Sequence, residues 1–160
     1  MTWQDFGAAI EAAIQTALDA DACLKTGGTY SVVTREAEPP QVDDEAPELW
    51  AGKCPYIGYR VREGGARITG TRFAELDHEV QFRVICEGNT PAATFSASRK
   101  IAHRIGALLR SVDGSAAFLS SAHQVLVSGW EIQPPEILPH NPYVVETICT
   151  VTVTVAYPEG

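Results

Sequence analysis

Positive charge is scarce in this chain. Its 160 residues hold 12 lysines and arginines against 20 aspartates and glutamates, which gives a net charge of -8 at pH 7 and a pI of about 4.9. A protein with this balance repels a phosphate backbone on average. Nucleic acid is therefore a poor candidate for a tight partner.

The short motifs that mark many enzymes are also missing. The sequence contains no phosphate-binding loop, no dinucleotide-binding glycine pattern, no nucleophile elbow and no zinc-binding histidine pair. Its 4 cysteines are too widely spaced for a zinc or redox pair, and its 4 histidines are scattered. The dipeptide Asp77–His78 has no nucleophile in a suggestive context, so we interpret it as part of a turn. We assign no catalytic, cofactor-binding or metal-binding residue and expect no enzymatic activity.

Long apolar runs are absent as well. Charged residues or threonine interrupt every hydrophobic segment before it reaches the roughly 18 residues that a membrane span needs. The first residues, Met1–Asp5, lack the basic start and apolar run of a secretion signal. We expect a soluble protein that is made in the cytoplasm and has no membrane partner.

Two segments have the periodicity of amphipathic helices. The first follows Thr2, a predicted N-cap, and places Ile10, Ile14 and Leu18 at four-residue spacing. The second begins after Thr90 and is predicted to end at residues 113–114. Its apolar face consists of Phe95, Ile101, Ala102, Ile105, Leu108 and Leu109. Its polar face carries Arg99, Lys100, His103 and Arg104, and the negative end of the helix dipole stabilises these cations.

Strand patterning occupies most of the remaining chain. The predicted strands are residues 30–35, 56–62, 67–73, 79–87, 123–132 and 143–157. Gly64–Gly65 is predicted to form a tight turn, so that the three middle runs make a meander. Cys86 and Cys149 lie in alternating apolar runs and are predicted to be reduced, buried thiols. The fold class is therefore α+β, with residues 1–160 as a single domain in which an antiparallel or mixed sheet packs against two main helices.

An acidic, proline-rich run interrupts this pattern at residues 36–50. From Glu36 to Glu48 the sequence reads EAEPPQVDDEAPE, which is too polar to bury and too rich in proline for a helix. We predict an exposed arm that is either solvated or ordered against a neighbouring subunit. Its candidate contact residues are Val42, Asp43, Asp44, Glu45, Leu49 and Trp50.

Arginines recur along the predicted meander. If the strands pair as predicted, one side of the sheet carries Arg60, Arg62, Arg67, Arg72 and Arg83. Such a face is either solvated or meets an acidic surface on another copy or another protein. We therefore predict that arm carboxylates of one subunit approach Arg60, Arg62 or Arg72 of its neighbour.

Residues 79–114, EVQFRVICEGNTPAATFSASRKIAHRIGALLRSVDG, combine an alternating strand, a short turn and a helix with a basic stripe. The stripe runs from Lys100 to Ile105 and is followed by Leu108 and Leu109. This segment resembles the middle of the tail terminator and related tail-completion proteins of long-tailed bacteriophages. The order of elements extends the resemblance over most of the chain, and the acidic arm departs from it.

The resemblance implies a tail terminator fold and a homo-oligomeric ring of six subunits, each contacting the next head to tail until the rotation closes. The ring would cap the head-proximal end of the tail tube, stop the tube protein from polymerising and provide a docking surface for neck or head-completion proteins. Such a protein belongs to the tail or neck of a virion assembled in the host cytoplasm. Six copies at -8 each would carry about -48, so DNA would pass through the lumen without specific binding.

Two other functions stay open at this point. A neck or head-completion adaptor with a similar small fold would bind the portal side instead of the tail tube. A small enzyme or ligand-binding domain, which is a different class, would have its pocket between the sheet and the helices.

Overall fold

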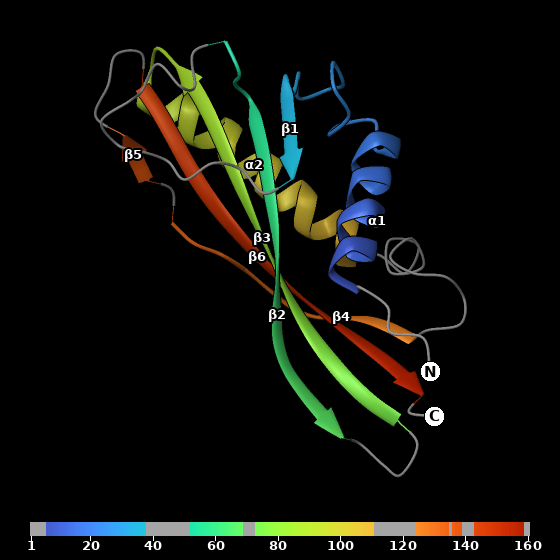
Figure 1. Ribbon diagram of the computed structural model, residues 1–160. Helices are drawn as coiled ribbons and strands as arrows, with labels where there is room; N and C mark the ends of the chain where they lie inside the picture. The colour runs from blue at the N-terminus through green and yellow to red at the C-terminus, as the bar shows by residue number, and fades with distance from the viewer. Residues whose placement is uncertain are drawn as a thin grey trace.

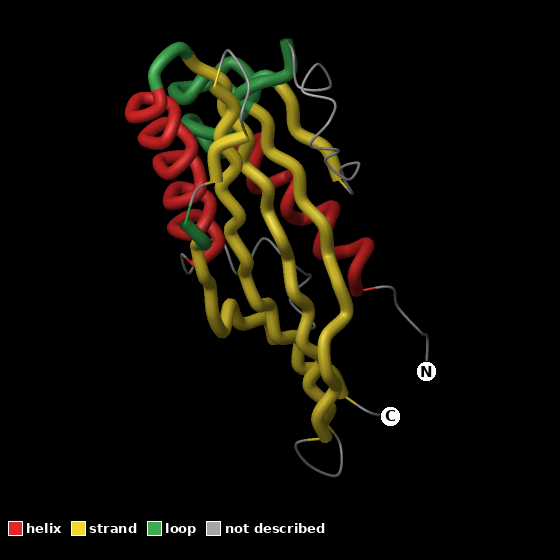
Figure 2. The backbone as a smooth tube through the Cα atoms, turned by 90° about the vertical axis from the view of Figure 1, so that its left-hand side faces the viewer, coloured by secondary structure: helices red, strands yellow, loops and turns green. Residues whose placement is uncertain are grey.

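The computed structural model describes residues 6–37, 52–68, 73–110, 124–134, 136–138 and 143–158. These residues form two α-helices and a mixed sheet of six strands in the order β1-β2-β3-β6-β4, with β5 paired to β6. Both helices lie on the same side of the sheet, and the far ends of β2, β3 and β6 extend past them (Figure 1 and Figure 2). The predicted α+β class is confirmed.

The helices cover the sheet with the apolar faces that the sequence predicts. Helix α1 (Phe6–Ala20) buries Ile10, Ile14 and Leu18 completely or nearly so. Helix α2 (Pro91–Arg110) buries Ile101, Ala102, Ile105 and Leu109, while Leu108 is partly buried and packs against the same core. One hydrophobic cluster joins both helices to one face of the sheet. The helix caps predicted at Thr2 and at residues 113–114 lie outside the described residues.

Strands β2 (Tyr56–Ile68) and β3 (Phe73–Gly88) form one long antiparallel hairpin instead of the predicted three-strand meander. The prediction of a turn at Gly64–Gly65 is wrong, because β2 continues through both glycines and the pairing register shifts between Glu63 and Ala66. Such a shift marks a β-bulge, where glycine is tolerated because it has no side chain to pack. The chain reverses between Ile68 and Phe73 instead.

The C-terminal strands complete the sheet. Strand β6 (Tyr143–Pro158) pairs with β3 on one side and with β4 (Gln124–Ile132) on the other. Both β4 and β6 lie close to the predicted bounds, residues 123–132 and 143–157. The short strand β5 (Glu136–Leu138) pairs with β6 beyond the end of β4. Strand β5 has no alternating pattern that would predict it, because it is only three residues long and lies in a proline-rich stretch.

The first strand also departs from its prediction. Strand β1 (Thr34–Ala37) is shorter than expected, begins later, and pairs in parallel with the start of β2. Residues 30–33 instead belong to a loop whose backbone is engaged in turns, such as the 3.1 Å hydrogen bond from Gly27 N–H to the Val32 carbonyl. Glu36 and Ala37, the first two residues of the predicted arm, belong to this strand, and residues 38–50 lie outside the described residues.

The two faces of the sheet differ in character. Val80, Phe82 and Val84 face the helices and are fully buried, as predicted, and the alternating residues of β6 that face the same way include Cys149, Val151 and Val153. Cys86 and Cys149 are buried and are not joined in a disulfide, which confirms the prediction of reduced, buried thiols. The other face is not covered by either helix, although Tyr56, Ile85 and Val144 form a small buried cluster at one end of it.

The interpretation of Asp77–His78 as a turn is wrong. Both residues lie inside β3, where His78 is completely buried on the helix side and Asp77 accepts a 2.8 Å hydrogen bond from the Thr154 hydroxyl. Polar residues next to a run of alternating apolar ones favoured a turn. The pairing of β3 with β6 overrides that local preference, because it continues through both residues.

Candidate functional site

A basic hollow lies between the polar face of α2 and the loop that follows α1. It has a volume of about 500 Å³ and is lined by Tyr30, Ser96, Arg99, Lys100, His103 and Arg104. Five of these residues belong to α2, and Tyr30 comes from the loop that precedes β1. We take this basic hollow as the candidate functional site.

The spacing of the cations on α2 places them on one side of the helix. Residues three and four positions apart are neighbours on a helix surface, so Arg99, Lys100, His103 and Arg104 form a single patch. The opposite side of the same helix is fixed in the core by Ile101 and Ile105. The cationic side therefore points outward on a rigid element, with Arg99, Lys100 and His103 exposed.

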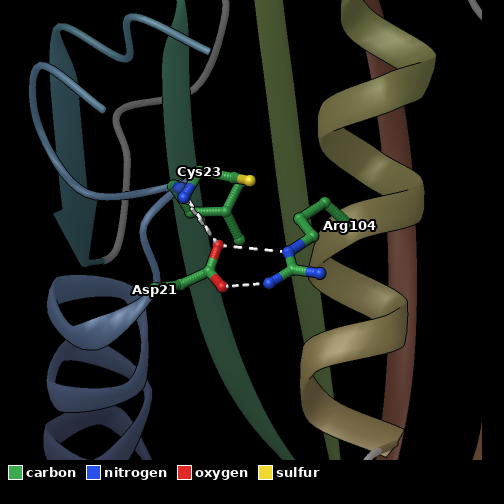
Figure 3. Close-up of polar contacts among 4 residues, drawn as sticks. Asp21, Cys23 and Arg104 are labelled. Atoms are coloured by element: carbon green, nitrogen blue, oxygen red, sulfur yellow. Dashed lines mark hydrogen bonds and ion pairs between the residues drawn. The ribbon is translucent and has the colours of Figure 1, made fainter. Parts of the chain in front are cut away.

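An ion pair joins the two walls of the basic hollow. Arg104 on α2 donates hydrogen bonds to both carboxylate oxygens of Asp21, and the bond from its Nε measures 3.2 Å. The same carboxylate accepts the backbone N–H groups of Cys23 and Leu24 at 3.2 and 3.1 Å. Figure 3 shows Asp21 between the start of the loop and the guanidinium on α2. Asp21 thus shapes its own loop and holds that loop against the helix.

The environment of Asp21 favours its charged form. Burial by itself would raise the pKa of this carboxyl, since its side chain is only 4% exposed. The hydrogen bonds and charge of Arg104, with the backbone N–H groups of Leu24 and Cys23, outweigh burial and lower the pKa below its usual value. The same pairing raises the pKa of Arg104. Both partners are therefore ionised at neutral pH.

The loop wall depends on a close backbone approach at Gly28. A Cβ atom at this position would lie 2.4 Å from the Ala22 carbonyl oxygen, which is closer than any side chain could fit. Two hydrogen bonds hold the loop beside it, from Thr29 N–H to the Ala22 carbonyl at 3.1 Å and from Tyr30 N–H to the Cys23 carbonyl at 3.2 Å. The chain turns at Gly27–Gly28, and this turn positions Tyr30 at the basic hollow.

The charge of the basic hollow is positive after its internal pairing is taken into account. Asp21 neutralises Arg104, whereas Arg99 and Lys100 form no ion pair with any residue in the described part of the chain. Guanidinium and ammonium groups on one side of an open hollow suit carboxylate or phosphate groups. The arrangement is therefore suited to binding an anionic group or segment.

The predicted interface residues are only partly within the described chain. Arg60 and Arg62 lie on the uncovered face of β2 and are exposed, as expected. Arg72 and the side chain of Arg67 lie outside the described residues. So do all of the predicted contact residues of the arm, which are Val42, Asp43, Asp44, Glu45, Leu49 and Trp50.

Arg60, Arg62 and Arg83 lie on one face of the sheet, as predicted, but this face also carries carboxylates. Arg83 lies on the same face as Arg60 but is paired with Glu146 and largely buried. Arg62 is opposite Glu79 in the pairing register, and Glu87 and Glu131 are also exposed there by the alternation of their strands. Acidic and basic side chains alternate across this face because the glutamates of β3, β4 and β6 share the orientation of the arginines.

Comparison with known proteins adds to this geometry. No family model and no curated protein matches the chain. Among solved structures, a chain from the virion of a native gene transfer agent particle matches with a TM-score of 0.57 and 14% identity, covering 96% of this chain and 99% of that chain. This fold is shared with a virion chain. A second solved chain, whose name states no function, matches with a TM-score of 0.57 and 14% identity over 92% of this chain and 94% of its own.

The described residues contain neither a metal-binding cluster nor a membrane-spanning helix. No group of three or more histidine, cysteine, aspartate or glutamate side chains is placed to hold a metal ion. Neither described helix has the length and apolarity needed to cross a membrane.

Sequence reasoning found the cations of the basic hollow but not their role. The helix dipole alone accounts for the charges of α2 in the sequence, and their three- and four-residue spacing is the signal that they share one side of the helix. The link from Asp21 to Arg104 joins residues 83 positions apart, and no local pattern identifies such a pair. The wall formed by Tyr30 could not be predicted while residues 30–35 were assigned to a strand.

Proposed function

We propose that this chain is a non-enzymatic structural subunit of a phage-like particle. The observation that carries the proposal is the fold likeness to a chain of a gene transfer agent virion, which covers 96% of this chain and 99% of the other. The likeness therefore concerns the whole described fold and not one motif within it.

Within such a particle, the proposed role is that of a tail terminator. The resemblance of residues 79–114 to tail terminator proteins supports it, and in the structure this segment contains most of β3 and all of α2, the strand and helix at the centre of the core. The chain would form a ring, proposed to contain six copies, on the head-proximal end of the tail tube. A neck or head-completion adaptor is the alternative within the same class.

The surface of the chain supports head-to-tail contact. A closed ring of identical subunits needs two different patches that fit each other, one on each side of the subunit. This chain has a cationic hollow on its helix side and an acidic run at residues 38–48. These two features are unlike and opposite in charge, which is the relation that a heterologous contact requires.

The proposed mechanism is occlusion by binding, with no bond made or broken. Seated on the last layer of the tube, the ring would cover the surface to which the next tube subunit adds. Its outer side would then present a new docking surface to neck proteins. The net charge of -8 per chain would keep DNA from adhering as it passes through the lumen.

The test is polymerisation of purified tail-tube protein from the same particle in the presence of this chain. Electron microscopy would measure tube length as a function of the ratio of the two proteins. A terminator shortens the tubes or arrests their growth, and each arrested tube carries a ring at one end. Unchanged growth, with the chain bound to portal-side proteins instead, would favour the neck adaptor and contradict the terminator role.

A further inference from the structure

We propose that the basic hollow is the docking site for the acidic run Glu38–Glu48 of a second copy of this chain. The inference rests on the proposed function, because it identifies the contact between neighbouring subunits of the ring. Each subunit would place its acidic run against α2 of the next subunit and receive another run on its own α2. Repetition of this contact in one direction produces a ring when the rotation closes.

The hollow supplies two cations that project from a helix fixed in the core and that form no ion pair within the described residues. Arg99 and Lys100 are exposed on a helix whose other side is buried, and neither is ion-paired within the described ranges. Arg104 is oriented by Asp21, so the wall of the hollow keeps its shape without a ligand. A preformed arrangement of this kind binds a partner at a lower cost in conformational entropy.

The acidic run supplies the complementary charge. Between Glu38 and Glu48 the sequence has 5 carboxylates and 3 prolines and contains neither lysine nor arginine. Carboxylates form directional hydrogen bonds with guanidinium groups, such as that of Arg99. The prolines restrict the backbone of the run, so ordering it against a partner costs less than ordering a glycine-rich segment.

The form of the hollow favours an extended segment over a small ligand or a nucleic acid. Its volume of about 500 Å³ lies within the range of ligand sites, but such sites are mostly apolar and enclosed, whereas four of its six lining residues are lysine, arginine or histidine. A nucleic acid would meet the net charge of -8 on the rest of the chain. A short acidic segment is smaller than a nucleic acid, so it can contact the cations of the hollow without lying along the rest of the negatively charged surface.

The basic hollow also suits the acidic run better than the uncovered sheet face does. On that face Arg62 lies opposite Glu79, and Arg83 is already paired with Glu146. Carboxylates arriving there would meet the like charge of Glu79 beside Arg62, and they would find Arg83 already paired. The hollow therefore replaces Arg60 and Arg62 as the preferred partner of the acidic run.

Two charge-reversed variants of the full chain test the contact. The first, Arg99→Glu with Lys100→Glu, makes the hollow acidic, and the second, Asp43→Lys with Asp44→Lys and Glu45→Lys, makes the run basic. Each alone should weaken association between copies on the order of tenfold or more, as measured by native mass spectrometry and by ring formation on tail tubes. An equimolar mixture should recover association, because the acidic run of the first fits the basic hollow of the second and the reversed pair also matches.

A charge-preserving variant, Arg99→Lys with Lys100→Arg, is the matched control and should associate like the parent. Melting curves verify that every variant is folded. If the reversals leave association unchanged, or if the mixture stays as weak as the separate variants, the contact between copies is refuted. If either of those two outcomes is found and the parent protein still caps tubes, the proposed function stands and only this contact between copies fails. A parent that neither associates nor caps tubes would contradict both.

Discussion

The pair formed by Asp21 and Arg104 is the contact on which the shape of the basic hollow depends. Replacing Arg104 by alanine removes two hydrogen bonds to the Asp21 carboxylate and leaves that group, 4% exposed, with its two backbone donors. The loop after α1 should then separate from α2 more readily. Replacing Asp21 by alanine removes these hydrogen bonds together with those to the N–H groups of Cys23 and Leu24.

The magnitude follows from the burial of each partner. Breaking a fully buried ion pair costs about 3–5 kcal/mol in free energy of unfolding. The Arg104 side chain is 41% exposed, so water replaces part of the hydrogen bonding that the Asp21 carboxylate loses when Arg104 is removed. We expect Arg104→Ala to cost about 1–2 kcal/mol and Asp21→Ala about 2–3 kcal/mol, because the second change also leaves two N–H groups of the loop without their acceptor.

A double-mutant cycle measured by denaturant unfolding isolates the pair. The coupling free energy between the two residues should be about 1 kcal/mol. Additive effects, with a coupling below about 0.3 kcal/mol, would refute the view that this ion pair joins the loop to α2.

The pH dependence of stability provides a second readout of the same pair. The folded pKa of Asp21 lies below its ordinary value of 3.8, so the folded state binds its proton less readily than the unfolded state. Its contribution to stability is therefore complete above about pH 4 and is lost as the pH falls through the folded pKa. Asp21→Asn should reduce this acid-induced loss relative to the parent protein. An identical pH profile for the two proteins would contradict the assignment.

Three further predictions concern the core, the thiols and the arm. Phe82→Ala should lower the free energy of unfolding by about 3–5 kcal/mol, since this buried ring packs beside Tyr59 under the helices, and a loss below about 1 kcal/mol in denaturant melts would contradict that packing. Burial raises the pKa of the Cys54 and Cys86 thiols to about 12, so iodoacetamide at about pH 8 should label both far more slowly in the folded than in the unfolded protein, and equal rates by mass spectrometry would oppose this. Deleting residues 38–48 should leave a folded subunit, shown by its melting curve, that caps tails poorly in a complementation assay, and raised salt should reproduce part of this defect through screening. A deletion variant that caps as well as the parent would show that the run is a solvated loop.

The sequence predicted the elements whose pattern is long and local. Helix α2 and strand β6 have regular periodicities over 15 residues or more, and both were located closely because burial on one face imposes that period. The assignment of Phe82 and Val84 to the helix side succeeded for the same reason. These are the elements that form the centre of the core.

The errors occurred where tertiary pairing overrides local preference. Gly64–Gly65 resembles a turn in isolation, yet the strand continues because β3 pairs with it on both sides of a bulge. Asp77–His78 is polar enough for a turn, but pairing with β6 continues through it. Strand β1 is only four residues long and depends on its contact with β2, so no local pattern could place its ends.

The candidate site was only partly predictable. The cations from Arg99 to Arg104 were identified as one exposed face, because helical spacing is visible in the sequence. The second wall requires Tyr30 and Asp21 to lie beside α2. Strands β1 to β3 separate these residues from α2 in the sequence, and only the packing of the helices on the sheet brings them together. The sequence predicts the acidic run to be a contact segment, and our proposal gives it the basic hollow as its partner in place of the sheet arginines.

The position of this chain in its own particle tests the central claim most directly. Purified particles carrying a gold-binding tag on the chain would be imaged by electron microscopy, and the copies per particle would be counted by mass spectrometry. The account predicts a single ring of label where the tail meets the head, with about six copies in each particle. Label distributed over the capsid or along the tail, or absent from the particle, would contradict it.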